Sequence, residues 1–451
     1  MDRKKLSRRD FLRMGALTTA GAALVACAPP PAAQPQPAPA KATEAPKPAE
    51  AKPTAAPAAP QPVSLTIWTF GSFFTDFYKK IFPKYKELAP SVDLKVEEIQ
   101  GAQMWDNLTA AFSAGKGAPD IADIEQGAMS RFFKGNISLL DLGDSMKTHT
   151  GDYVMARCDP YSYKGKIYGV DHCLCPVVMF YRWDLFEKAG ITMPIATWQD
   201  FKTATVKLKD QGVAAISFAD RGWADYHMLL TQGGTGGFFD EKGEPIFDSP
   251  VHVDTLKWYV DMIKNGLAIP TPAGAAAYAA LGEGKIASQI GADWYGGFLK
   301  NNIKDQGKGK WKAVPMPAWK TGGSRTSANG GTGYTITKQS KAPQEAWKFI
   351  EWALFDKDNK YLEYQINGLL PPIKSMLSDP RYLTPDEWFS GQKLGELYLE
   401  MAKEQPRHNR SPYFTEATTL INDAVFGAAS EGKPAEVVLN NAMKELRKQM
   451  A

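Results

Sequence analysis

The chain has 451 residues, with 53 basic and 49 acidic side chains, and it is rich in aromatic residues, with 12 Trp, 17 Tyr and 22 Phe. Its first 27 residues hold six of the basic and two of the acidic groups, so the remainder carries 47 of each and is formally neutral. This balance excludes a typical nucleic-acid-binding protein, which needs a basic excess or stripe.

Residues 1–27 are predicted to be a twin-arginine lipoprotein signal peptide. Arg8 and Arg9 stand before Phe11-Leu12, as in the twin-arginine export signal. The weakly apolar stretch 14–26 is shorter than the roughly 20 apolar residues that span a bilayer, which favours a signal-peptide core. Residues 24–27, Leu-Val-Ala-Cys, resemble a lipobox, in which Cys27 receives a diacylglycerol. These signals predict an extracytoplasmic protein that is anchored to the cell membrane by an N-terminal lipid.

Residues 28–62 are almost entirely Ala, Pro, Lys, Glu, Gln and Thr and contain no aromatic residue. Such a composition cannot bury enough apolar surface to offset the entropy of ordering. Pro-rich chain favours extended polyproline II, so we expect a disordered, semi-rigid stalk that carries a folded head.

After the stalk, strand-like and helix-like patterns alternate. Apolar alternation and helical spacing predict strand, helix, strand, helix and strand at residues 63–69, 73–88, 92–99, 104–112 and 118–124. This order predicts a parallel sheet with helices on both faces. Ligands of such sheets bind at the carboxyl ends of the strands, which makes Phe70, Glu125 and Gln126 candidate binding residues. Nearly 390 residues exceed one comfortable core, so two domains are expected.

Amphipathic helices are predicted further along, at residues 198–209, 251–265, 343–355 and 416–429. The chain has five His and no Gly-x-Ser-x-Gly, His-Glu-x-x-His or P-loop pattern. We therefore expect a binding protein and not an enzyme.

Several segments in a fixed order resemble the family 1 extracellular solute-binding proteins of ABC importers, of which maltose-binding protein is a familiar member. The resemblance covers residues 65 to 446 and rests on 118–120, 163–170, 181–191, 282–295, 315–317, 330–331 with 340–341, and 346–352. It implies an α/β, two-lobed periplasmic-binding-protein fold of type II, whose discontinuous lobes are joined by crossing hinge segments. Lobe 1 would comprise 63–170 plus 334–380, and lobe 2 would comprise 171–333 plus 381–451.

The resemblance also implies a function. A mono- or oligosaccharide would bind between the lobes, hinge closure would enclose it, and an ABC permease with its ATPase would receive it. No cofactor is expected. Two alternatives stay open: a non-sugar solute such as a polyamine, peptide or metal chelate, and an exported carbohydrate-active hydrolase.

Sugars offer apolar C–H faces and hydroxyls, so their binding calls for aromatic platforms with planar polar partners. The resemblance places Trp294 and Tyr295 in the cleft, and Trp223 is a second candidate platform, with core packing as the alternative for both Trp residues. Asp171, at a predicted crossing, and Tyr413 complete the candidates. Trp105, on a helix face, is expected in the core.

Three cysteines remain beside Cys27. Cys173 and Cys175 stand two apart on a segment expected to be extended, which would direct both sulfurs to one face. We expect Cys158 to form a disulfide with Cys173 or Cys175, since exported proteins keep disulfides. Free thiols, or a metal site that includes His172, are the alternatives.

Overall fold

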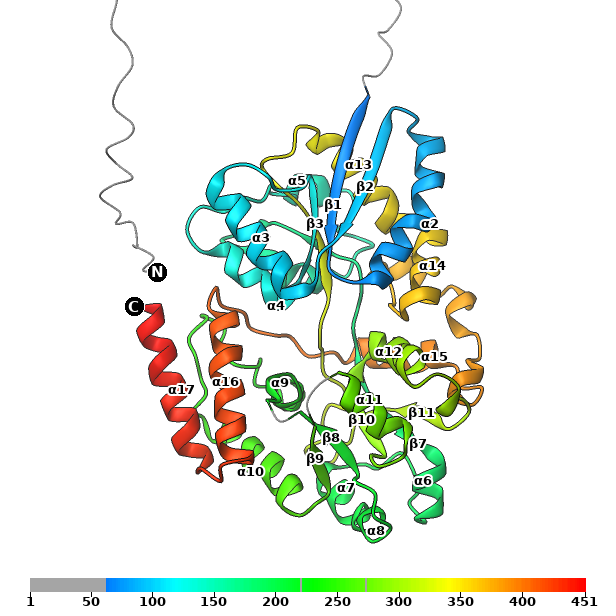
Figure 1. Ribbon diagram of the computed structural model, residues 1–451, viewed down its shortest axis with the longest axis vertical. Helices are drawn as coiled ribbons and strands as arrows, with labels where there is room; N and C mark the ends of the chain where they lie inside the picture. The colour runs from blue at the N-terminus through cyan, green and yellow to red at the C-terminus, as the bar shows by residue number, and fades with distance from the viewer. Residues whose placement is uncertain (1–61, 220, 272–273) are drawn as a thin grey trace, which may run out of the picture. The chain divides into compact units, whose positions relative to one another are not determined.

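The computed structural model describes residues 62–219, 221–271 and 274–451. The predicted signal peptide with Cys27 and all but the last residue of the predicted stalk lie outside the described residues. In the described part, no helix is long and apolar enough to cross a membrane. Two larger sheets, each with its own helices, form the framework of this part of the chain, and two pairs of strands add to them (Figure 1).

The first lobe is built on a five-stranded sheet in the order β2-β1-β3-β12-β6. Its strands are β1 (Val63–Thr69), β2 (Val92–Glu98), β3 (Ile121–Glu125), β6 (Val170–Asp171) and β12 (Thr332–Ile336). Its helices are α2 (Ser72–Leu88), α3 (Gly101–Ala114), α4 (Gln126–Met129), α5 (Gly143–Met146), α13 (Pro343–Phe355) and α14 (Lys357–Asn367). Helices α2 and α14 lie together on one side of the sheet, and α3 and α4 lie on the other (Figure 1).

The sequence patterns explain these elements. In β1 the apolar positions Leu65 and Ile67 are buried and alternate with partly exposed residues, as a half-covered strand requires. Helix α2 buries Phe74, Phe77, Tyr78, Ile81 and Tyr85, which recur on one helical face. The predicted parallel order is confirmed for β1, β2 and β3.

The prediction of a purely parallel sheet is wrong at its far edge. Strand β12 runs antiparallel to β3, with Tyr334 opposite Asp123, and β6 runs antiparallel to β12, with Gly333 opposite Asp171. The reason is that β12 enters the sheet on its return from the second lobe, so no crossover helix sets its direction.

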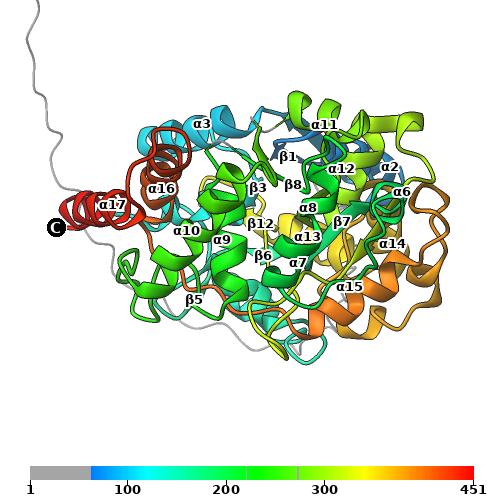
Figure 2. The ribbon, with the colours of Figure 1, turned by 90° about the horizontal axis from the view of Figure 1, so that it is seen from below.

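The second lobe holds the three-stranded sheet β10-β7-β11 and the parallel pair β8-β9. Its strands are β7 (Val177–Arg182), β8 (Ile216–Phe218), β9 (Ala268–Pro270), β10 (Ser288–Ala292) and β11 (Trp311–Val314). Its helices are α6 (Trp183–Lys188), α7 (Trp198–Ala204), α8 (Val206–Lys209), α9 (Trp223–Gln232), α10 (Pro250–Lys264), α11 (Ala275–Gly282), α12 (Asp293–Ile303), α15 (Leu394–Lys403), α16 (Phe414–Ala429) and α17 (Ala435–Met450). Figure 2 shows α16 and α17 side by side at one end, beside α10.

The helix predicted over 198–209 is broken into α7 and α8 at Thr205. The Thr205 hydroxyl donates to the carbonyl of Phe201 at 2.7 Å, a local bond that competes with regular helix geometry. A small ribbon of β4 (Ser162–Tyr163) and β5 (Lys166–Ile167) precedes β6.

Two stretches of chain connect the sheets of the two lobes. Residues 171–177 lead from β6 to β7, and residues 327–332 lead back to β12. A further stretch joins α15 to α16 of the second lobe and runs beneath the first lobe in Figure 1. In it, Gln405 Nε2 donates to Leu174 O at 2.9 Å, and Asn409 N donates to Gly236 O at 2.8 Å. These bonds hold it against the crossing segment 171–177 and against the second lobe.

A buried charged group in the sheet gives a first prediction. Asp123 of β3 is fully buried and accepts a hydrogen bond from the Tyr78 hydroxyl at 2.6 Å, and burial raises its pKa to about 6. The pKa of Asp123 is thus higher in the folded state than in the unfolded state, so protonation of Asp123 stabilises the fold. This stabilisation is complete below about pH 4 and is lost as the pH rises through 6. Asp123→Asn should therefore raise the melting temperature at pH 8. The corresponding increase in the free energy of unfolding should be up to about 3 kcal/mol.

At pH 4 the same variant should melt close to the wild type, because the carboxyl is then protonated in the folded state and about half protonated in the unfolded state. Calorimetry at the two pH values measures the difference. An equal change at pH 4 and pH 8 would contradict the assignment of the effect to ionisation.

Candidate functional site

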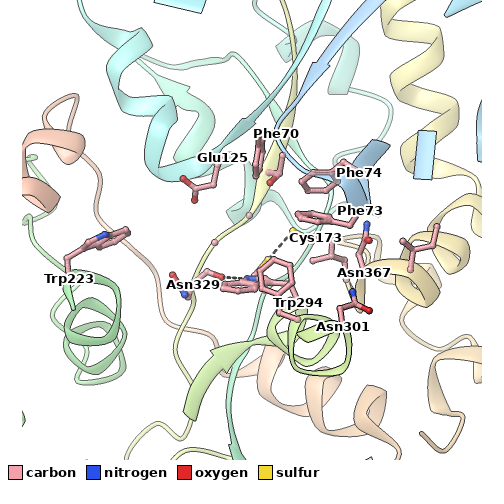
Figure 3. A pocket seen from close by; sticks show the side chains of 18 residues that line it. Phe70, Phe73, Phe74, Glu125, Cys173, Trp223, Trp294, Asn301, Asn329 and Asn367 are labelled. Carbon is pink, nitrogen blue, oxygen red and sulfur yellow. Dashed lines mark hydrogen bonds between the residues drawn. The ribbon is translucent and has the colours of Figure 1, made fainter. Parts of the chain in front are cut away.

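A cavity of about 270 Å³ lies where the carboxyl ends of β1 and β3 face helix α12. Residues of both lobes line it, together with the crossing residues Cys173, Cys175, Asn329 and Gly330 (Figure 3). Its wall is mainly aromatic: the rings belong to Phe70, Phe73, Phe74, Trp223, Trp294 and Phe298. Its polar side chains are few and include Glu125, Asn301, Asn329 and Asn367. An apolar wall with a few convergent polar groups is the general character of a small-molecule site.

Trp294 is held firmly in this wall. Its indole Nε1 donates to the carbonyl of Asn329 at 3.0 Å, and its backbone N donates to the Asp293 carboxylate at 2.9 Å. The ring packs edge-on against Phe298 at 5.3 Å, from the next turn of α12. With its polar edge bonded to the crossing segment, the ring is available to a ligand as a rigid apolar platform.

Rings from the first lobe continue this wall. Phe73 contacts Phe298 across the lobes at a centroid distance of 5.7 Å. Phe73 also packs on Phe74 at 4.4 Å, and Phe74 on Phe70 at 5.3 Å. Phe70 in turn packs on Trp105, which is buried, as the sequence predicts.

Glu125 lies at the end of β3 and at the start of α4. Its Oε2 accepts hydrogen bonds from Gly127 N at 2.7 Å and Ala128 N at 3.2 Å, which holds the carboxylate at the cavity wall. Burial raises its pKa above the ordinary range, while the nearby guanidinium of Arg410 acts in the opposite direction. It is the one carboxylate among the described residues that line the cavity.

The predicted site residues divide into two groups. Trp294, Trp223, Phe70 and Glu125 line the cavity together. Gln126 is buried beside it and donates from Nε2 to the carbonyl of Gly330. The remaining three, Tyr295, Asp171 and Tyr413, do not line it.

Each of these three has another environment. Tyr295 follows Trp294 on α12, so it points away from the cavity and packs near Phe180 and Tyr278 at 5.8 and 6.0 Å. The ring of Tyr413 lies outside the cavity with the ammonium of Lys134 over it at 4.2 Å.

Asp171 is fully buried and forms an ion pair with Arg157 at 2.5 Å. Arg157 also donates to the carbonyl of Gly330 at 3.1 Å, so the pair ties two of the crossing segments together. Gly331 has φ +138°, and a Cβ there would overlap both Arg157 Nη2 and Asp171 Oδ2. Only glycine fits at this position.

The predicted disulfide is absent, because Cys158, Cys173 and Cys175 are all free and buried. The sulfurs of Cys173 and Cys175 lie 3.0 Å apart, and Cys175 takes a left-handed φ of +54°, so the segment is not the extended chain assumed from sequence. Burial raises the pKa of Cys158 to about 12 and that of Cys173 to about 11, which keeps these thiols protonated and poorly nucleophilic.

The alternative of a metal site finds no support in this arrangement. His172 Nδ1 lies 2.7 Å from the Glu363 carboxylate, in a buried network with Lys360. Across residues 62–219, 221–271 and 274–451, no group of three or more His, Cys, Asp or Glu side chains is placed to hold a metal ion.

Sequence reasoning missed several lining residues. Phe298 and Asn301 stand four and seven residues after Trp294, so helical spacing could have placed them on its face. Phe73 and Phe74 stand three and four residues after Phe70, which lies at the sheet edge. Asn367, at the end of α14, carried no such signal, because it reaches the cavity from a remote part of the chain.

Comparison with known proteins gives a consistent result. The family model described as bacterial extracellular solute-binding protein matches residues 72–360. The arabinooligosaccharide-binding protein of Bacillus subtilis (strain 168) is 30% identical over 85% of this chain and 92% of its own length. The lactose-binding protein of Rhizobium radiobacter is 23% identical over 83% of this chain and 90% of its own length.

Among solved structures, the GacH receptor of Streptomyces glaucescens GLA.O, determined unliganded and with acarbose, superimposes with a TM-score of 0.74. It is 18% identical and covers 86% of this chain and 98% of its own. This likeness confirms the predicted two-lobed fold class.

The environment of Asp171 gives a second prediction. Asp171→Asn leaves the buried Arg157 cation without its counter-charge and should destabilise the protein by about 3–5 kcal/mol. The exposed pair Lys86–Asp93 offers a matched control, since Asp93→Asn should change stability by at most about 1 kcal/mol. Denaturant unfolding of the two variants measures both, and equal small effects would show that the Arg157–Asp171 pair does not stabilise the crossing segments.

Proposed function

Because the chain belongs to the family of bacterial extracellular solute-binding proteins, we propose that it captures a mono- or oligosaccharide between its lobes and delivers it to the permease and ATPase of an ABC importer. Membership of that family also indicates an extracytoplasmic location. The observation that carries the proposal is the cavity between the lobes, with Trp294 fixed in its wall and Glu125 and three Asn side chains around it.

The chemistry of this wall suits an uncharged sugar. Aromatic rings stack on the C–H faces of pyranose or furanose rings, and carboxylate and amide groups form hydrogen bonds with hydroxyls. Two relatives are named for the sugars that they bind, arabinooligosaccharides and lactose, and the GacH receptor has been determined in complex with acarbose. The neutral balance of the chain beyond residue 27 accords with an uncharged ligand.

Delivery requires a motion, which we propose to be hinge closure. Lobe 1 comprises 63–170 plus 334–380, and lobe 2 comprises 171–333 plus 381–451. The placement of the two sheets supports this division, with β12 returning to the first lobe after residue 331. A ligand that touches both walls stabilises the closed form by its contacts with each. No step of this function needs a cofactor.

The alternatives receive less support. A polyamine would require several carboxylates, whereas Glu125 is the one carboxylate in the described cavity lining. A glycoside hydrolase of the usual kind needs a pair of carboxylic acids across the scissile bond, which this lining does not offer.

A sugar panel tests the proposal directly. We expect the melting temperature to rise with at least one of arabinotriose, lactose and acarbose, and not with spermidine or a peptide. Trp294→Ala should weaken binding of that sugar at least ten-fold, about 1.4 kcal/mol or more, because it removes the stacking surface. Isothermal titration calorimetry measures the affinity.

Trp347→Ala is the matched control, since Trp347 is a partly buried Trp of α13 that does not line the cavity. It should leave the affinity unchanged. If spermidine alone stabilises the protein, the ligand is a cationic solute and not a sugar. If shorter sugars are released during incubation, the protein is a hydrolase.

We further propose that residues 1–27 are a twin-arginine signal and that Cys27 carries the lipid anchor. Cys27→Ser should move the protein from the membrane fraction to the soluble extracytoplasmic fraction, as measured by fractionation and immunoblotting. Cys158→Ser is the control and should remain with the membrane. If the Cys27 variant stays in the membrane fraction, the lipid is not attached there.

A further inference from the structure

A small polar recess adjoins the cavity on the side of Trp223. It shares Glu125, Trp223, Asn329 and Gly330 with the cavity and is completed chiefly by Gln126, His227, His408 and Arg410. Its volume of about 10 Å³ is room for one water-sized group. A hydroxyl group fits this space, and a whole sugar ring does not.

The polar atoms around the recess lack partners. Six buried atoms have no hydrogen-bond partner in the described part of the chain: Arg410 Nε and Nη1, His227 Nε2, both ring nitrogens of His408, and Gln126 Oε1. The side chains of His227 and Gln126 are each only 3% exposed. Buried polar groups are nearly always paired, and each unmade bond costs about 1–3 kcal/mol. The recess is therefore built to hold a polar group that comes from elsewhere.

The charges in the recess are separate from one another. The guanidinium of Arg410 lies over the ring of Phe414 at 4.2 Å, and it forms no ion pair with Glu125 in the structure. The two hydrogen bonds of Glu125 both use Oε2, which leaves Oε1 available. Burial lowers the pKa of Arg410 to about 10, so it stays cationic at neutral pH, while burial keeps the pKa of both His227 and His408 low and their rings neutral.

We propose that Glu125 and Arg410 bind one hydroxyl of an uncharged sugar unit that stacks on Trp223, the hydroxyl donating to Glu125 Oε1 and accepting from Arg410. A hydroxyl satisfies both groups because it is donor and acceptor at once. A carboxylate could satisfy Arg410 but would be repelled by Glu125. This assignment rests on the proposed sugar-binding function and specifies the part of the sugar that is recognised.

The position of the recess also bears on ligand length. Figure 3 shows Trp223 apart from the cluster of Trp294 with Phe73 and Phe74, with Glu125 and Asn329 between them. Two separate platforms call for at least two sugar units, one on Trp294 and one on Trp223 with its hydroxyl in the recess. An oligosaccharide should therefore bind more tightly than its monosaccharide.

The variant Arg410→Met tests the assignment. It keeps an apolar chain against Phe414 and removes a half-buried cation whose Nε and Nη1 have no hydrogen-bond partner. The melting temperature of the ligand-free protein should thus stay the same or rise, while the affinity for arabinotriose, lactose or acarbose, whichever the wild type binds, falls at least ten-fold. Glu125→Gln should weaken binding of the same sugar, because the amide keeps one hydrogen-bond acceptor but loses the negative charge.

Arg381→Met is the matched control, since Arg381 stacks on Tyr361 at 4.7 Å outside the cavity. This variant should bind the sugar with the same affinity as the wild type. The inference is overturned if Arg410→Met binds as tightly as the wild type while Trp294→Ala does not, for then the recess holds only water. It is also overturned if the ligand-free Arg410→Met protein melts lower, since that shows a structural role. If no sugar of the panel binds the wild type, the proposed function itself fails.

Discussion

The buried ion pair between Arg157 and Asp171 organises the region where the lobes meet. Arg157 reaches from the first lobe to Asp171, at the end of β6, and to the carbonyl of Gly330 on the returning segment. The neighbouring carbonyl of Asn329 then receives the indole N–H of Trp294. The orientation of the main aromatic platform thus depends on a charge pair that lies outside the cavity. Asp171 supports the site without lining it.

The division of labour between aromatic and polar groups follows from this frame. Rings from α2 and α12 form a continuous wall across the two lobes. The polar side chains come from a strand end and a crossing segment, at Glu125 and Asn329, and from helices α12 and α14, at Asn301 and Asn367. Helices are suited to carry rings at spacings of four residues, as in Trp294 and Phe298. Strand ends and crossings expose backbone and carboxylate groups, as at Glu125 and Gly330.

Much of the first lobe was predictable from sequence, because the local periodicity of apolar residues determines where its strands and helices form. The strand over residues 63–69 and the helix over 343–355 have the predicted bounds. What depends on distant partners was not predictable: the antiparallel entry of β12, the burial of Asp171 against Arg157, and the contribution of Asn367. Tyr295 failed to reach the cavity because one residue along a helix turns a side chain by about 100°. Arg410 was overlooked because it lies in a stretch without periodicity, whose place is fixed by bonds to the second lobe.

The contact between Phe73 and Phe298 joins the lobes through two uncharged rings. Attraction between such rings is not screened by dissolved ions, whereas an exposed ion pair weakens as salt is added. A protein outside the cytoplasm meets whatever osmotic and ionic conditions its surroundings impose. Raising the salt concentration should therefore weaken this contact less than the half-exposed Lys134–Glu416 ion pair, which also spans the lobes.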